Sequence, residues 1–291
     1  MSHPPEISAI IVSWNVRQLL AECLASLQAA VGIDLQVVVV DNASADGSAE
    51  MVRRDFPDVK LIANHENRGF AAAVNQGIAI SHGDIVLVNP DLRLQPDTLS
   101  RLEHALQRDP HAGIAGPRIT YPDGHLQPSV RRFPTTKDLI VTLLKLPNLM
   151  PGLVRTYAGL NVNYDLEQAV DQVMGSCFLI RRATLDAVGR FDEDFYIWFE
   201  EVDYCRRALS HGWHTLYVPT AHAIHAKGAS FRQVRPLTKH RILKQSMVVY
   251  AHKHLGFWPS RLIEITGWLS FVMTGLQQLL RLRKPSSARN L

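Results

Sequence analysis

The chain has 291 residues, of which 46% are hydrophobic and 20% are charged. This composition is that of an ordinary globular protein, long enough to bury a full core as one large domain or two fused halves. The net charge of +4 is too small to indicate a nucleic-acid partner, but it suits anionic small molecules or an anionic membrane surface.

The cysteines indicate the cellular setting. Cys23, Cys177 and Cys205 are widely spaced and odd in number, so they predict neither a disulfide framework nor a zinc site. They favour a reducing, cytoplasmic location. The first six residues lack the basic and apolar regions of a secretory signal, which favours the same location.

Apolar runs alternate with helical patterns over the first 110 residues. Strands are expected at 9–13, 36–40, 59–62 and 85–88, each followed by a segment with helical spacing. The runs are continuous, as in strands that are buried on both faces. Four β-to-α units therefore predict an α/β fold with a Rossmann-like, mostly parallel sheet flanked by helices.

The strand at 85–88 ends in Asn89-Pro90-Asp91. Ligands of open α/β sheets bind beyond the carboxyl ends of the strands, so Asp91 is well placed to hold a metal ion bound to phosphates. The alternative is a plain turn toward the next helix, because Asn, Pro and Asp are all common in turns. The tripeptide alone does not decide between the two.

The second half of the chain is less regular. Strands are expected at 113–119, 173–181 and 215–219. Prolines interrupt the apolar part of 111–172, which is therefore interpreted as a lid or an acceptor-side excursion.

Residues 191–203 form the densest acidic and aromatic segment, and helical spacing begins within it. Glu200 and Glu201 fall in or just before the first helical turn. The exposed N–H groups and the helix dipole favour ionised carboxylates there, which suits acids that act as bases. Capping acids on a solvated helix face are the alternative.

The usual glycine-rich phosphate motifs are missing. There is no G-x-G-x-x-G motif after the first strand and no G-x-x-x-x-G-K-[ST] motif, so neither a dinucleotide-binding dehydrogenase nor a P-loop NTPase is supported. A nucleotide diphosphate would then need a metal and basic groups, which Asp91, Arg68 and His225 can supply. A histidine such as His225 is, however, more often a plain polar loop residue.

Seven blocks in order along the chain point to a known family. They are Ile10–Asn15, Val39–Ser48, Glu66–Gly77, Asn89–Asp91, Gly175–Cys177, Phe199–Asp203 and His225–Ser230. Together they resemble the family 2 inverting glycosyltransferases of GT-A fold, especially the bacterial rhamnosyltransferase-like branch.

The resemblance implies a donor site. By analogy, Trp14 stacks on the nucleotide base, Asp41 hydrogen-bonds to that base, and Arg68 and Asn75 line the site. The implied donor is a dTDP- or UDP-linked sugar.

The resemblance also implies a divalent metal, Mg²⁺ or Mn²⁺. Asp91 is the last acid of the D-x-D metal motif, and His225 is the second expected ligand. Asn89 replaces the first acid, a departure that is also typical of the rhamnosyltransferase-like branch, and Asn89 and Asp91 are both expected in the donor site.

The catalytic base of the family lies in a Glu-Asp pair. This chain has Glu200-Glu201 instead, which places Glu201 at the base position with one extra methylene. The other positions expected on the acceptor side or in support of the base are Glu200, Asp203, Gly175, Ser176 and Trp198.

These residues predict an inverting glycosyltransferase. It would move a sugar, with rhamnose one candidate, to a hydroxyl of a cell-surface polysaccharide or a lipid-linked glycan. The alternative is a nucleotide-sugar-binding module without catalysis, suggested by Asn89 and Glu201. A membrane scaffold is a weaker third interpretation, because it gives the charged residues no reason to share a cleft.

The transferase domain is expected at 1–256, with a nucleotide-binding half at 1–110 and an acceptor-side half at 111–256. An amphipathic helix and a basic tail follow at 257–291. The helix carries apolar residues at steps of three and four: Leu262, Ile265, Leu269, Val272, Leu276 and Leu279. This stripe is expected either to lie on the inner face of the cell membrane, or to pack on the domain or on a second copy in a homodimer.

Overall fold

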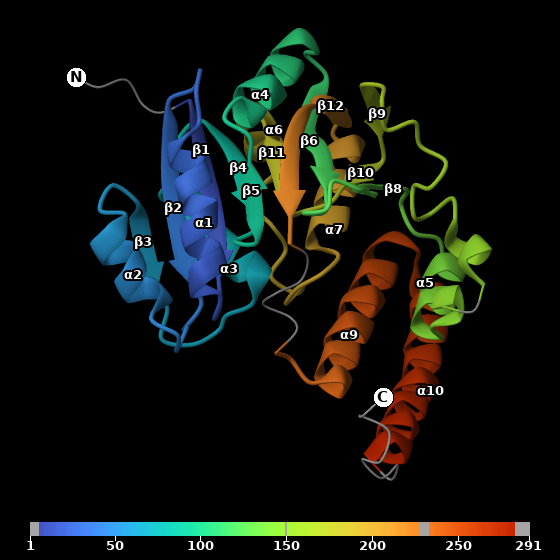
Figure 1. Cartoon of the computed structure of the whole chain (residues 1–291). Coiled ribbons are helices and arrows are strands. Elements are labelled where there is room, and N and C mark those ends of the chain that lie inside the picture. Colours follow the sequence, from blue (N-terminus) through green and yellow to red (C-terminus); the bar gives the residue numbers. More distant parts are fainter. Residues whose placement is uncertain (1–5, 149, 227–232, 283–291) are drawn as a thin grey trace. The chain divides into compact units, whose positions relative to one another are not determined.

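The computed structural model describes residues 6–148, 150–226 and 233–282 (Figure 1). The chain divides into two compact units, and each is described by itself. One comprises 1–133 and 155–232, and the other comprises 134–154 and 233–291. This division differs from the expected boundary at 256, because two earlier segments pack with the C-terminal helix.

A mixed sheet of ten strands, counted over the described residues, forms the core of the first unit. Its main order is β3-β2-β1-β4-β11-β6-β12-β5, with β7 beside β6 and β9 beside β12. The strands are β1 (Ile7–Ser13), β2 (Leu35–Asp41), β3 (Lys60–Ala63), β4 (Asp84–Val88), β5 (Leu92–Leu94), β6 (Ala112–Thr120), β7 (Leu126–Gln127), β9 (Gln168–Val170), β11 (Cys177–Ile180) and β12 (His214–His225). A separate pair consists of β8 (Val130–Arg131) and β10 (Gln172–Val173).

The sheet is parallel from β3 through β2 and β1 to β4, as the continuous apolar runs predicted. β11 lies between β4 and β6 and is antiparallel to both, whereas β6 and β12 are parallel to each other. The carboxyl ends of β1, β2 and β4 therefore meet at one edge of the sheet.

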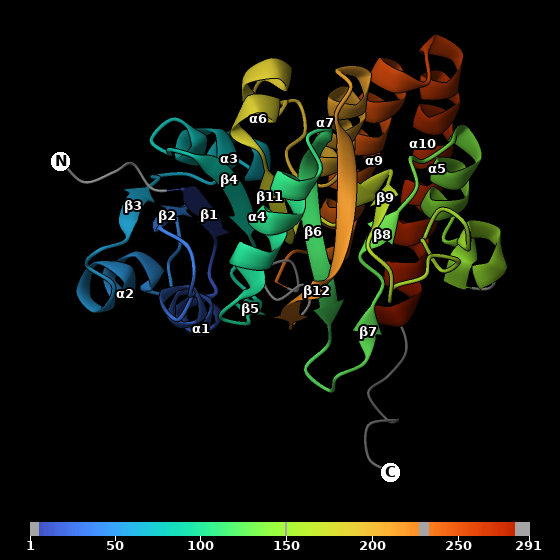
Figure 2. The same ribbon diagram turned by 90° about the horizontal axis from the view of Figure 1, so that it is seen from above.

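Helices cover both faces of this sheet (Figure 2). One face packs against α1 (Arg17–Gln28), α2 (Ser48–Asp55) and α4 (Thr98–Arg108), and the other against α3 (Phe70–Ile78), α6 (Arg182–Val188) and α7 (Glu200–Ser210). Alternation along β1 explains how one strand serves both layers, because Ala9 and Ile11 join the first cluster and Ile10 joins the second. The predicted α/β fold is confirmed.

The second unit is helical. It contains α5 (Thr136–Leu143), short 3₁₀ turns at Leu146–Asn148 and Pro151–Val154, α9 (Pro236–His254) and α10 (Phe257–Leu282). α9 and α10 form a hairpin (Figure 1), whose turn contains Gly256 at a φ of 100°, a conformation that favours glycine. None of the described helices is long and apolar enough to cross a bilayer.

The segment 111–172, interpreted as a lid or excursion, is divided between the two units. Its middle part, 134–154, packs against α10, where Ser270 Oγ donates to the carbonyl of Leu143 and Lys145 Nζ donates to Thr274 Oγ1 at 3.0 Å. Its flanks form strands of the first unit, including β6. β6 lies where a strand was expected, but β7, β8, β9 and β10 have only two or three residues each, too few for the sequence to reveal this division.

Candidate active site

The loops after β1 and β2 lie side by side. Ser13 and Asp41, the last residues of these strands, are paired in register. Asn15 accepts from the Ala45 N–H at 2.7 Å through Oδ1, and its own N–H donates to Ser44 Oγ at 2.9 Å. The structure thus brings the segment containing Trp14 next to Asp41, as the prediction of a shared base site requires.

Asp41 is buried, with 2% of its surface exposed. Its Oδ2 atom accepts from the Ser44 N–H at 2.9 Å, but Oδ1 has no hydrogen-bond partner among the described residues. Buried carboxylate oxygens are normally satisfied, so this atom can accept a hydrogen bond from a ligand N–H group.

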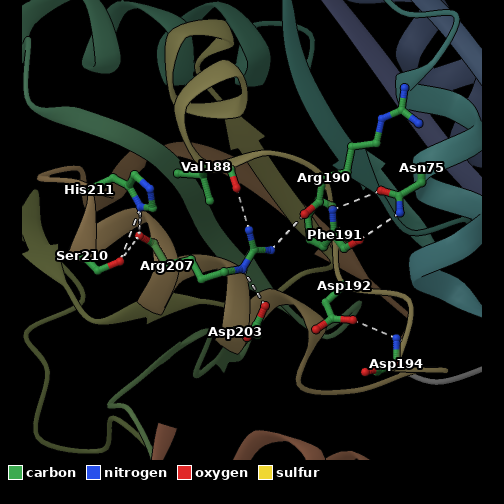
Figure 3. A network of polar contacts seen from close by, with 10 residues as sticks. All are labelled: Asn75, Val188, Arg190, Phe191, Asp192, Asp194, Asp203, Arg207, Ser210 and His211. Carbon is green, nitrogen blue, oxygen red and sulfur yellow. Dashed lines mark hydrogen bonds and ion pairs between the residues drawn. The ribbon is translucent and has the colours of Figure 1, made fainter. Parts of the chain in front are cut away.

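Arg68 lies beside the same loops, but Asn75 does not. Asn42 Oδ1 accepts from the Arg68 N–H at 3.3 Å, which fixes the backbone of Arg68 next to β2. The amide of Asn75 instead donates to the Phe191 carbonyl at 2.9 Å and accepts from the Phe191 N–H at 3.1 Å (Figure 3). In this structure Asn75 holds the segment that leads to α7, and its contact with a donor stays a prediction.

The two expected metal ligands are brought together by β5. This strand follows Asp91 and pairs with the end of β12, so that Leu92 lies opposite His225. His225 Nε2 lies 3.1 Å from Asp91 Oδ1, and both residues are buried. His225 was expected in a loop, but it is the last residue of β12; the rest of its matched block, 227–230, lies outside the described residues.

The two expected metal ligands fit a metal site only in part. The described residues contain no group of three or more His, Cys, Asp or Glu side chains that could hold a metal. Magnesium sites in nucleotide enzymes often use only one or two protein ligands, and the substrate phosphates supply others. Asp91 and His225 offer one carboxylate and one imidazole, so a metal here would need the donor diphosphate to complete its coordination.

Gly175 and Ser176 connect the Asp91 segment to α7. The Asn89 N–H donates to the Ser176 carbonyl at 2.8 Å, where β11 begins beside β4. A Cβ atom on Gly175 would lie 3.3 Å from the Cβ of Glu201, so a side chain there would press on Glu201. The end of β4 and the start of α7 therefore lie close to one another.

Glu200 and Glu201 form a tightly spaced acidic pair in the first turn of α7. The Oε2 atom of each is buried without a hydrogen-bond partner among the described residues. Burial raises the pKa of both carboxyls, and the neighbouring charge of Glu201 raises the pKa of Glu200 further. Arg131 acts in the opposite direction on the pKa of Glu201. A carboxylate with a raised pKa is a stronger base than an exposed one.

The backbone before α7 is strained. Trp198 and Phe199 have φ values of 67° and 73°, in a region that non-glycine residues rarely adopt. The Phe199 carbonyl accepts from the Asp203 N–H at 2.9 Å and so begins the helix. Such strain is held in place by surrounding contacts and is common at functional sites. Trp198 is half-buried here, and its acceptor-side role stays a prediction.

The loop before α7 docks on the donor-side loop. Tyr196 accepts from the Phe70 N–H at 2.6 Å through its carbonyl, and its hydroxyl donates to Asn67 Oδ1 at 3.0 Å. Gly69 lies against this contact, and a Cβ atom there would be only 2.7 Å from the Tyr196 carbonyl oxygen. The position therefore requires glycine. The contact with Tyr196 links the Arg68 segment to the segment that carries the acidic pair.

Asp203 stabilises the position of α7. Its buried carboxylate accepts from Arg207 Nε at 2.8 Å, and the same guanidinium donates to the carbonyls of Val188 at 2.9 Å and Arg190 at 3.0 Å (Figure 3). This clamp fixes α7 to the end of α6. Asp203 therefore holds the helix that carries Glu201.

Two residues near the site were missed by the sequence analysis. The Oε1 atom of Gln127, on β7, lies 3.1 Å from His225 Nδ1. The positive charge of Arg131, on β8, lowers the pKa of Glu201. Both belong to two-residue strands in the segment that was interpreted as a lid. No local sequence signal marks strands of that length.

Comparisons with known proteins identify the family. The family model for Glycosyl transferase family 2 matches residues 8–167. The N-acetylglucosaminyl-diphospho-decaprenol L-rhamnosyltransferase of Mycobacterium tuberculosis is 29% identical over 284 residues, covering 88% of this chain and 87% of the relative. Rhamnosyltransferase WbbL of Escherichia coli strain K12 is 34% identical over 97 residues, covering 33% of this chain and 34% of the relative.

A solved structure shares the fold. The mannosyltransferase PcManGT from Pyrobaculum calidifontis, in complex with GDP-Man and Mn²⁺, has a TM-score of 0.60 at 19% identity, covering 98% of this chain and 82% of that chain. The family match spans more than half of the sequence, so the resemblance that the seven blocks predicted is confirmed. The chain belongs to glycosyl transferase family 2 and is a glycosyltransferase of GT-A fold.

Proposed function

We propose that this glycosyltransferase moves a sugar, with rhamnose the leading candidate, from a dTDP- or UDP-linked donor to a hydroxyl of a lipid-linked glycan, with inversion. The name of the M. tuberculosis relative describes L-rhamnosyl transfer to N-acetylglucosaminyl-diphospho-decaprenol, which supports this choice of sugar and acceptor. The observation that carries the proposal is the Glu201 Oε2 atom, which is buried without a hydrogen-bond partner in the part of the chain that the structure describes. Gly175 and Ser176 connect this carboxyl to the end of the strand before Asp91.

The proposed reaction is a single displacement. Glu201 takes the proton of the acceptor hydroxyl as that oxygen bonds to the anomeric carbon, and the bond from this carbon to the diphosphate oxygen breaks. Its raised pKa keeps Glu201 a competent base, and general-base catalysis typically contributes about 10² to 10⁴ in rate. No covalent bond between sugar and enzyme is needed.

The donor is expected to lie along the strand ends. Trp14 would stack on the base, Asp41 Oδ1 would accept from the base, and Arg68 would face the diphosphate. These roles agree with the placement of the three residues in adjoining loops. The role of Asn75 would be indirect, through the segment that it anchors at Phe191.

We propose that Asp91 and His225 would hold Mg²⁺ or Mn²⁺ with the donor. The ion would offset the negative charge that develops on the departing diphosphate. The support is the buried pairing of the two side chains, 3.1 Å apart. The presence of Mn²⁺ with GDP-Man in the structure of PcManGT gives further support.

A lipid-linked acceptor would place the protein at the inner face of the cell membrane, held there through its C-terminal helix. The alternative for that helix is a second copy in a homodimer. The non-catalytic alternative for the whole chain is less favoured, because the chain belongs to a family of transferases and the candidate base has a buried Oε2 atom.

A transfer assay tests the proposal. The purified chain is incubated with dTDP- or UDP-sugars, a polyprenyl-diphosphate N-acetylglucosamine acceptor and Mn²⁺ or Mg²⁺, and products are identified by mass spectrometry. We expect transfer from one donor, its loss with a chelator and its return when metal is added. Donor binding by calorimetry without transfer to any acceptor in the panel would support the binding-module alternative instead.

A further inference from the structure

Helix α10 has its apolar side on the outside. We define its outward face as Trp258, Leu262, Ile265, Trp268, Leu269 and Val272, which are between 49% and 79% exposed. These residues recur at steps of three and four, so they form one continuous stripe on the helix. A helix docked on a protein core normally turns such a stripe inward, and this helix does not.

The inward side of α10 combines the fully buried Ile263 with several small hydroxyl side chains. Ser260, Thr266, Ser270 and Thr274 are all at most 8% exposed. Ser270 Oγ donates to the Leu143 carbonyl, while the hydroxyls of the other three donate to carbonyls within α10. The buried side is therefore fully hydrogen-bonded at these positions. The outward direction of the apolar side thus leaves none of these four buried hydroxyls without a partner.

Positive charge is concentrated in the same unit. By sequence, residues 134–154 and 233–291 contain 12 Lys and Arg against 2 Asp and Glu, a net charge of +10. The rest of the chain contains 19 Lys and Arg against 25 Asp and Glu, a net charge of −6. The modest overall charge of +4 therefore hides a strongly cationic helical unit.

Cationic and aromatic side chains flank the outward face. Lys244 Nζ lies 4.0 Å from the centre of the Trp268 ring, and the Arg261 guanidinium lies 5.3 Å from that of Phe257. Tryptophan is favoured at the boundary between lipid headgroups and acyl chains, and long cationic side chains can reach the headgroups from there.

From these observations we infer that the outward face of α10 inserts into the headgroup and upper acyl-chain region of an anionic bilayer. The inserted apolar side chains leave water, while the +10 charge of the unit attracts anionic headgroups. This gives the membrane contact of the proposed function a defined surface and a lipid preference.

A second copy is a poorer occupant of this face. Self-association through α10 would bring together two units that each carry +10, and this repulsion opposes a dimer at low ionic strength. Glu264 is the single acid within 233–291, and it already accepts from Arg261 at 2.8 Å. The outward face therefore lacks the acidic partners that a cationic copy would need.

Vesicle flotation of the full chain tests the inference without any sugar donor, so its failure would leave the transferase proposal standing. The vesicles are phosphatidylcholine alone or phosphatidylcholine with phosphatidylglycerol. We compare the native chain with the double variant Ile265→Gln/Leu269→Gln. The matched control is Leu160→Gln/Leu166→Gln, which replaces two exposed leucines of the other unit.

We expect the native chain and the control to float with phosphatidylglycerol vesicles, and added salt to weaken this binding. The α10 variant should bind at least about tenfold more weakly, since it loses two inserted apolar side chains. Acyl chains brominated near the headgroup should quench the tryptophan fluorescence of the native chain, a readout that needs no variant.

Other outcomes would overturn the inference. They are an absence of binding to anionic vesicles, equal binding by the α10 variant, or no quenching by brominated lipid. A native dimer in light scattering that the α10 variant converts to a monomer would assign the face to a second copy.

Discussion

Helices α7 and α10 both bury polar side chains, but the buried groups are of different kinds. α7 buries Glu200 and Asp203, carboxyls that are costly to remove from water. α10 buries hydroxyls such as Ser270 and Thr274, which find carbonyl partners at little cost. Buried acids need a charged partner such as Arg207 or a shift of their pKa, whereas the buried hydroxyls of α10 are satisfied by carbonyls.

Within α7 the acids differ in their hydrogen-bond partners. Asp203 is paired with Arg207, whereas the Oε2 atoms of Glu200 and Glu201 have no partner among the described residues. Changes at Glu201, at the Asp203–Arg207 pair and at Glu200 should therefore affect turnover, stability and the pH dependence of stability, respectively.

The largest effect is expected for Glu201→Gln. The amide cannot take the acceptor proton, so turnover should fall by about 10² to 10⁴. Donor affinity should remain close to that of the native chain, because the side chain keeps its size. Steady-state transfer and calorimetry with the donor measure the two properties. Near-native turnover in this variant would contradict the assignment of the base.

Arg207→Leu should chiefly reduce stability. It leaves the fully buried Asp203 carboxylate without its guanidinium, which typically costs about 3 kcal/mol or more. Urea unfolding measures the change. The matched control is Arg182→Leu, which removes an exposed i,i+4 ion pair with Asp186 at 2.9 Å and should cost less than about 1 kcal/mol. Equal losses in the two variants would show that the buried clamp is no stronger than a surface pair.

Asp91→Asn should weaken metal-dependent donor binding by about tenfold to a hundredfold, since it removes a charged ligand while keeping the shape of the side chain. Calorimetry with the donor, with and without Mn²⁺, measures this. Asp97→Asn, on the exposed segment before α4, is the control. An unchanged dependence of donor affinity on Mn²⁺ would rule out Asp91 as a metal ligand.

The smallest effect is a change in how stability depends on pH. Burial and Glu201 raise the folded-state pKa of Glu200, so the folded chain retains a proton that the unfolded chain has released. Stability therefore falls as the pH rises from the unfolded pKa through the folded pKa. Glu200→Gln removes this loss and should stabilise the protein on the order of 1 kcal/mol above that window.

Urea unfolding of the native chain and Glu200→Gln at several pH values checks this expectation. The two stability curves should converge below the ordinary pKa of a glutamate, where the native carboxyl is protonated in both states. A variant that is less stable than the native chain at neutral pH would show that the carboxylate is stabilised by its surroundings.

The parallel half of the sheet could be predicted from sequence, because its buried strands are continuous apolar runs. The same pattern placed Asp41 and Asp91 at strand ends, where the structure has them. The convergence of Asp91 with His225 required β5, a strand of three residues that carries no pattern of its own. Distance along the chain does not reveal such pairings, and here only the seven matched blocks indicated them.

The apolar stripe of α10 was also predictable, but its direction was not. Spacing identifies Leu262, Ile265, Leu269 and Val272 as one face, and it does not say whether protein or another medium covers that face. The answer depends on α9 and on residues 134–154, which pack against the opposite side. The side chains of Leu276 and Leu279, and the tail from 283, lie outside the described residues.

The most direct test of the central claim is the anomeric configuration of the product made by the native chain. Nuclear magnetic resonance of the isolated glycan gives this configuration, for comparison with that of the donor. A single displacement with Glu201 as base predicts inversion. Retention would require an enzyme nucleophile or front-side attack, and it would contradict the account given for this site.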